Sequence, residues 1–116
     1  MNAGELGAVF AGGMAGALAR AGMAEAWPAQ PGHWPWATFA VNVAGAALLG
    51  WVVAGGRFHR LLGTGFCGAL TTFSGLQLEV LQMLDANRIG LTLLYVAGSL
   101  AAGLAAVHVA GRARAA

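Results

Sequence analysis

The chain has 116 residues, of which 59% are hydrophobic and 9% carry a charge, against roughly 25% charged residues in soluble domains. A chain of this size leaves about a third of its unfolded surface exposed after folding, so its apolar surface cannot all be hidden in its own core and lipid is the expected solvent. The net charge of +2 comes from scattered arginines without lysine, which argues against a nucleic-acid-binding stripe, and the single cysteine, Cys67, excludes an intramolecular disulfide.

The first predicted membrane span covers residues 6–26 and is interrupted by Arg20. Ala17-Leu18-Ala19 is similar to a signal-peptide cleavage site, but no basic residue precedes it, so a retained membrane helix is the better interpretation. Gly12 and Gly16 lie four residues apart, a spacing that allows another helix to approach closely in lipid. A helix that is merely rich in alanine and glycine would explain the same residues.

Residues 27–36 contain three prolines and three tryptophans. Proline breaks helices and tryptophan is enriched at headgroup depth, so this stretch is predicted to be a loop that anchors the chain at the membrane interface.

The second span, residues 36–56, has no charge but contains Asn42, which shares a helix face with Thr38. An amide without a partner is costly in lipid, so Asn42 is expected to face another helix or water. Two roles remain open for it: a hydrogen bond that joins two helices, and a place in a permeation path.

A basic connection at residues 57–60 leads to the third span, residues 61–84, and a turn at residues 85–88 leads to the fourth, residues 89–111. In the third span Glu79 lies on the same helix face as Thr72. In the fourth span Tyr95 and Ser99 are one helical turn apart.

The predicted fold is therefore an all-α membrane protein, a single domain of four transmembrane helices. One such subunit encloses little volume, so a symmetric or pseudo-symmetric dimer is expected if anything is to pass through it. The side of the membrane that carries both termini has more arginines than the other side. By the positive-inside rule, this difference favours cytoplasmic termini. They divide into Arg57, Arg60, Arg112 and Arg114 on that side and Arg20 and Arg88 on the other.

The stretch Gly68-Ala69-Leu70-Thr71-Thr72-Phe73-Ser74-Gly75 is a polar interruption in the third span. Glycine, threonine and serine disfavour helix, so the backbone is predicted to unwind between Gly68 and Ser74. Irregular backbone at membrane depth is tolerated where it is buried in protein or lines a cavity, and its free carbonyls suit a small cation. The ring edge of Phe73 and the donors of Thr72, Ser74 and Asn42 suit a small anion. Threonines that bond back to their own helix and only bend it are the alternative interpretation.

Three motifs carry a resemblance to a known family: Gly68-Ala-Leu-Thr-Thr-Phe-Ser with Glu79 downstream, Thr38-Phe-Ala-Val-Asn42-Val-Ala-Gly45, and Gly13-Met-Ala-Gly16-Ala-Leu-Ala-Arg20. Together with Tyr95 through Ser99, they resemble the Fluc/CrcB fluoride channels, in the same order along all four spans. The resemblance implies an antiparallel dimer with two narrow pores, which exports fluoride passively across the cytoplasmic membrane.

By position, the resemblance also implies roles for single residues. Asn42 would coordinate or orient fluoride, Phe73 would offer its ring edge, and Thr38 would line an entry vestibule to which Arg20 supplies positive potential. The pore wall and its polar path would include Thr72, Glu79, Tyr95 and Ser99, with the Ser74 hydroxyl as a further donor. The backbone carbonyls of Gly68 and Thr71 from both subunits would hold a structural sodium ion at the dimer centre.

One part of the motif departs from the family. Leu76 stands at the pore position where a second phenylalanine is usual, and Gly75 stands where a hydroxyl residue is usual. Some relatives are heterodimers whose subunits have fixed, opposite orientations and whose second pore has degenerated. Leu76 and the arginine bias fit that arrangement, so homodimer and heterodimer both remain open. Fluoride, sodium and lipid are the expected partners, and nucleic acid is not.

Two other transporter classes share some of these features. A small multidrug-resistance transporter has the same length and number of spans but needs a carboxylate inside its first span, whereas Glu5 precedes that span here. A proton-coupled fluoride antiporter would use Glu79 to bind a proton at membrane depth. An enzyme is not expected and no catalytic residue is assigned, because no nucleophile, base and orienting acid occur together.

Overall fold

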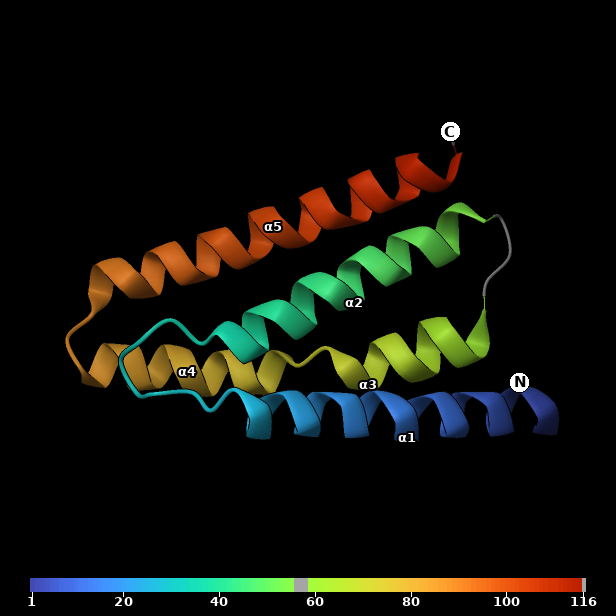
Figure 1. Ribbon diagram of the computed structural model, residues 1–116, viewed down its shortest axis with the longest axis horizontal. Coiled ribbons are helices and arrows are strands. Elements are labelled where there is room, and N and C mark those ends of the chain that lie inside the picture. The colour runs from blue at the N-terminus through green and yellow to red at the C-terminus, as the bar shows by residue number, and fades with distance from the viewer. Residues whose placement is uncertain (56–58, 116) are drawn as a thin grey trace.

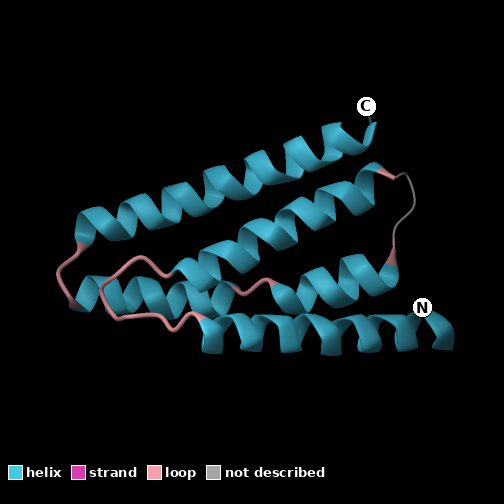
Figure 2. Cartoon of the chain, in the orientation of Figure 1, coloured by secondary structure: helices cyan, strands magenta, loops and turns pink. Residues whose placement is uncertain are grey.

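The computed structural model describes residues 1–55 and 59–115, and all regular structure within these ranges is helical (Figure 2). The elements are α1 (Ala3–Ala26), α2 (Trp36–Ala54), η1 (Arg60–Cys67), α3 (Gly68–Leu70), α4 (Phe73–Asp85) and α5 (Ile89–Ala115). Part of the predicted basic connection, including Arg57, and the predicted end of the second span at residue 56 lie outside the described residues.

Three of the described helices, α1, α2 and α5, are long and apolar enough to cross a membrane. In place of a third continuous span, η1, α3 and α4 follow one another, with η1 and α3 beside α1 and α4 continuing past the end of α1 (Figure 1). Both termini lie at the same end of the bundle (Figure 1).

Two helices extend beyond their predicted bounds. α1 begins at Ala3, because the Asn2 side chain accepts a hydrogen bond from the Glu5 N–H at 2.7 Å and so caps the helix. α5 continues to Ala115 and carries two arginines in its last turn, where positive charge interacts favourably with the helix dipole.

The helices pack in two pairs, with α1 against η1 and α3, and α2 against α5. A Cβ atom added at Gly12 would overlap the Leu61 carbonyl, and one added at Gly16 would overlap the Phe66 carbonyl. Glycines therefore allow the backbones of α1 and the third segment to touch, which confirms that these small residues form a close helix contact.

The irregular backbone in the third segment is shorter than predicted. The prediction that it unwinds from Gly68 is wrong, because Gly68 has helical angles, φ −61° and ψ −37°, and begins the short helix α3. Only Thr71 (φ −76°, ψ 151°) and Thr72 (φ −143°, ψ 117°) are extended, and α4 begins at Phe73, before the predicted end of the unwound stretch at Ser74.

A second irregularity, which the sequence did not predict, precedes Gly68. η1 is wound as a π-helix, and the Gly68 N–H donates to the Gly63 carbonyl five residues earlier. Cys67, at the end of η1, is buried.

Candidate functional site

The break between α3 and α4 is stabilised by its own threonines. The Thr71 hydroxyl donates to the Cys67 carbonyl at 3.0 Å, so this residue bonds back to its helix. The Thr72 hydroxyl accepts from the Gly75 N–H at 3.0 Å and caps α4, and it lies 3.3 Å from the Ser74 hydroxyl. The pair does more than bend a helix, because it ends one helix and starts the next.

Asn42 of α2 binds the extended backbone of this break. Its side-chain NH₂ donates to the Thr72 carbonyl at 3.3 Å, and its side-chain oxygen accepts from the Thr72 N–H at 2.8 Å. The amide thus supplies both partners that the Thr72 backbone lacks outside a helix. Of the two roles considered for Asn42, the structure provides the interhelical hydrogen bond, and a contact with a permeating ion stays a prediction.

Arg20 reaches the break from α1. The Arg20 side chain is half-buried, and its Nε donates to the Ala69 carbonyl at 3.0 Å. Arg20 therefore lies inside the bundle and not with the charges at its ends. Without Arg20, the described arginines at the two ends of the bundle are Arg60, Arg112 and Arg114 at the end that carries the termini and Arg88 at the other end.

A cavity of about 220 Å³ lies beside the break. It brings together four of the residues that the sequence singled out, Arg20, Thr38, Thr72 and Ser74, with Ala24, Ala37, Val41 and Gly75 completing its wall. Its polar lining consists of three hydroxyl groups and one guanidinium, and no carboxylate is among the described residues that line it. All of these polar groups can donate hydrogen bonds, so the lining suits an anion.

A second group of polar side chains lies in the protein interior next to the cavity. Glu79 is 8% exposed and Tyr95 is fully buried. A Cβ atom added at Gly75, which lines the cavity, would lie 3.7 Å from Glu79 Oε1, so the Glu79 carboxyl group lies beside the cavity wall.

Several atoms of this interior group have no partner. Among the described residues, the buried side-chain polar atoms without a hydrogen bond are Trp34 Nε1, Glu79 Oε2, Tyr95 OH and Ser99 Oγ. Buried polar groups are nearly always paired, so such a cluster indicates a place where a polar ligand or water is bound. Three of these residues were predicted from the sequence, whereas Trp34 was predicted only as a membrane anchor.

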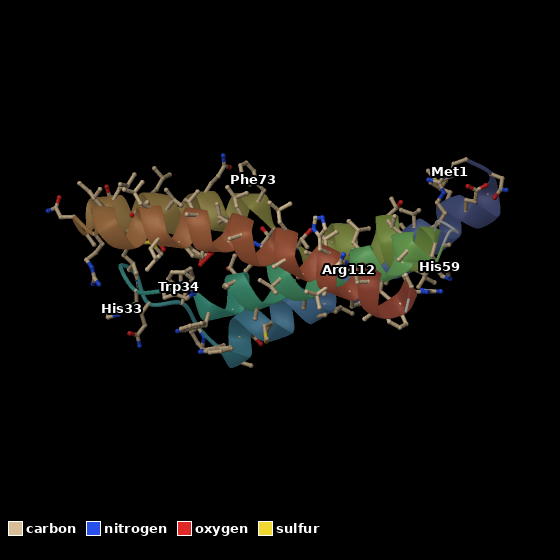
Figure 3. The ribbon with its side chains drawn as sticks, turned by 90° about the horizontal axis from the view of Figure 1, so that it is seen from above. Met1, His33, Trp34, His59, Phe73 and Arg112 are labelled. Carbon is tan, nitrogen blue, oxygen red and sulfur yellow. The ribbon has the colours of Figure 1, made fainter. Side chains whose placement is uncertain are left out.

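The two hydrophobic pore candidates lie outside this cavity. Phe73 is 72% exposed and lies at the edge of the bundle (Figure 3), and Leu76 is half-buried. Neither is among the described residues that line the cavity. Their predicted contact with an ion therefore needs surfaces beyond this single chain.

The predicted sodium ligands, the carbonyls of Gly68 and Thr71, lie at the two ends of α3. Thr71 has an extended backbone, so its carbonyl is not aligned with the helix axis, and neutral carbonyl oxygens suit a hard cation. Among the described residues no cluster of three His, Cys, Asp or Glu side chains could bind a metal ion, so a cation site here would depend on the backbone.

Comparison with known proteins places these features in a family. Residues 7–111 match the family model described as "CrcB-like protein, Camphor Resistance (CrcB)". The chain is 49% identical over 114 residues to a protein of Mycolicibacterium paratuberculosis named "Fluoride-specific ion channel FluC 1", covering 91% of this chain and 86% of that protein. It is 46% identical to the protein of the same name from Mycobacterium tuberculosis, with the same coverage. It is 42% identical over 105 residues to "Fluoride-specific ion channel FluC" of Chlorobaculum tepidum, covering 84% of this chain and 83% of that protein.

Proposed function

Because the chain belongs to the CrcB family, we infer that it is a fluoride-specific ion channel subunit and not an enzyme. It is a multi-pass membrane protein that lets fluoride move passively across the membrane and so lowers the fluoride content of the cell. The observation that carries this conclusion is the cavity at the helix break, where every polar side chain among the described lining residues can donate a hydrogen bond.

The cavity chemistry fits fluoride, a small anion that is strongly hydrated. A selective pathway must replace the hydration shell with groups of the protein, as the carbonyl rings of cation channels do for their ions. In this chain the hydroxyls of Thr38, Thr72 and Ser74 serve as those donors. The single guanidinium of Arg20 attracts the anion, and because its Nε is already bound to the Ala69 carbonyl, its charge is partly offset. Conduction requires binding that is weak enough for the ion to leave.

In this mechanism Asn42 does not bind the ion itself but positions Thr72, a residue that lines the cavity. Both functional atoms of its side chain are bound to the Thr72 backbone, and Thr72 lines the cavity. Asn42 therefore orients the donors that face the ion. From the cavity, the path continues past Gly75 to Glu79, Tyr95 and Ser99, whose unpaired atoms offer further hydrogen-bonding sites.

The active assembly is an antiparallel dimer of subunits that cross the cytoplasmic membrane four times, with η1, α3 and α4 together as the third crossing and both termini in the cytoplasm. Dimerisation supports the pore because Phe73, exposed at the break, then has a partner surface to which its ring edge can face. The carbonyls of Gly68 and Thr71 would hold a structural sodium ion between the subunits. The dimer is either a homodimer or a heterodimer with a related subunit, in which case Leu76 belongs to the weaker pore.

Fluoride efflux from liposomes that contain the purified chain tests this function. Efflux is expected when potassium permeability is supplied by valinomycin, and Asn42→Asp and Phe73→Ile are expected to reduce it. Efflux from this chain alone indicates a homodimer, and efflux that requires a co-expressed related subunit indicates a heterodimer. If neither preparation releases fluoride, the channel assignment is wrong.

A proton-coupled fluoride antiporter is the second candidate, and the unpaired Glu79 Oε2 in the protein interior favours it. A channel conducts fluoride without a pH gradient, whereas an antiporter needs one. Efflux at equal pH on both sides, with no accompanying proton flux, is the expected result. Loss of a pH-gradient-driven component in Glu79→Gln would instead assign proton coupling to this carboxyl group.

A further inference from the structure

Trp34 is the member of the unpaired polar cluster that has no role in the function proposed so far. It lies in the loop between α1 and α2, and its indole Nε1 is buried without a partner among the described residues. The side chain lies between this loop and α5 (Figure 3), with its ring 5.2 Å from that of Tyr95 at an angle of 79°. Trp34 is thus packed on the residue whose hydroxyl is also unpaired.

The benzo ring of Trp34 lies against α5. A Cβ atom added at Gly98 would lie 3.4 Å from Trp34 Cη2 and 4.0 Å from Cζ2, so this edge of the ring faces the turn of α5 that carries Tyr95 and Ser99. Within the indole, Nε1 is bonded to Cε2, which is itself bonded to Cζ2. The N–H therefore lies on the edge of the indole that ends at Cζ2 and Cη2, the two atoms nearest to α5.

The other side of Trp34 faces a different space. A cavity of about 540 Å³ in the loop is lined by Trp27, Pro28, Gln30, His33, Trp34 and Trp36. Trp34 belongs both to the wall of this loop cavity and to the contact with α5. It therefore stands between the loop cavity and the Glu79, Tyr95 and Ser99 cluster.

We propose that Trp34 is a further residue of the fluoride path, which donates its indole N–H to the anion at the loop end of the Glu79, Tyr95 and Ser99 cluster. A buried N–H donor without a partner suits an anion, and Trp Nε1 has no acceptor function that could compete. The loop cavity then serves as the mouth through which the ion reaches water. This inference rests on the proposed function of the chain as a fluoride channel.

Two replacements of Trp34 separate the donor from the packing, in the full-length chain in liposomes. Benzothienylalanine keeps the bicyclic ring and puts sulfur in place of the N–H, and Trp34→Phe removes the donor with part of the ring. Both are expected to slow fluoride efflux about tenfold or more, the loss expected for one hydrogen bond to an ion. The matched control is Trp51→Phe near the other end of α2, where the side chain is 44% exposed and lines neither cavity, so the rate is expected to stay unchanged.

The melting temperature of each variant in detergent accompanies the rates. A slower rate for the benzothienylalanine variant at an unchanged melting temperature supports the proposal. A wild-type rate for that variant, or a rate that falls only together with the melting temperature, overturns it, since Trp34 would then act through packing alone. The proposed function fails separately, if the unmodified chain releases no fluoride.

Discussion

Asn42→Ala tests whether the side-chain amide of α2 holds the break in the third segment. The substitution removes both partners of the Thr72 backbone, whose N–H and carbonyl bind Asn42 at 2.8 and 3.3 Å. An unsatisfied buried polar group costs about 1–3 kcal/mol, and because Thr72 is half-buried we expect the free energy of unfolding to fall by about 2–4 kcal/mol for the two groups. Fluoride efflux should be lost as well, because Thr72 lines the cavity.

The free energy is measured by reversible unfolding in mixed micelles with increasing sodium dodecyl sulfate. Val43→Ala is the matched control, because Val43 is the next residue of α2 and lines an apolar groove with Trp27 and Trp36, away from the break. It should cost about 1 kcal/mol or less. If Asn42→Ala is no more destabilising than this control, the amide does not stabilise the break and the assignment of its role is wrong.

Three further predictions concern packing, capping and charge. Gly16→Ala should lower the free energy of unfolding by about 2 kcal/mol or more, because its Cβ would overlap a backbone carbonyl. The control Gly7→Ala, where a Cβ would meet nothing within 4 Å, should raise the free energy of unfolding by up to about 1 kcal/mol. Equal effects of the two substitutions would contradict the close contact. Thr72→Ala should cost about 1 kcal/mol through loss of the α4 cap and Thr72→Ser much less, and equal losses would show that the hydroxyl is not the stabilising group. Arg20→Met should slow fluoride efflux from liposomes, and Arg20→Lys should slow it less, because lysine keeps a positive charge at the cavity. An unchanged rate in Arg20→Met would show that Arg20 does not contribute to the path.

The sequence predicted the helical segments well because lipid imposes a simple condition on each of them. A span needs a long apolar run, and α1, α2 and α5 each contain one. A close approach of another helix to α1 was one of two interpretations of Gly12 and Gly16, and the structure shows that the third segment makes this contact. The bounds of the break were less accurate, because low helix propensity at Gly68 does not prevent helix when its N–H finds carbonyl partners in η1.

The sequence predicted which polar residues matter for the interior but not how they are arranged. The sequence selected Arg20, Thr38, Thr72 and Ser74, and the fold brings all four to one cavity. It gave no reason to add Trp34, because three tryptophans within ten loop residues have the composition of an interfacial anchor. Nothing local distinguishes the one whose ring turns inward to Tyr95.

By itself, therefore, the sequence determined that the chain is a helical membrane protein with a polar break opposite an amide, since apolar runs and intramembrane polar residues are properties of single segments. The tertiary structure decided which groups meet at that break. Asn42 and Thr72 are 30 residues apart, so their pairing depends on how α2 lies against the third segment. Helical periodicity shows which face of a helix a side chain occupies, but the partner on that face is set by packing between helices.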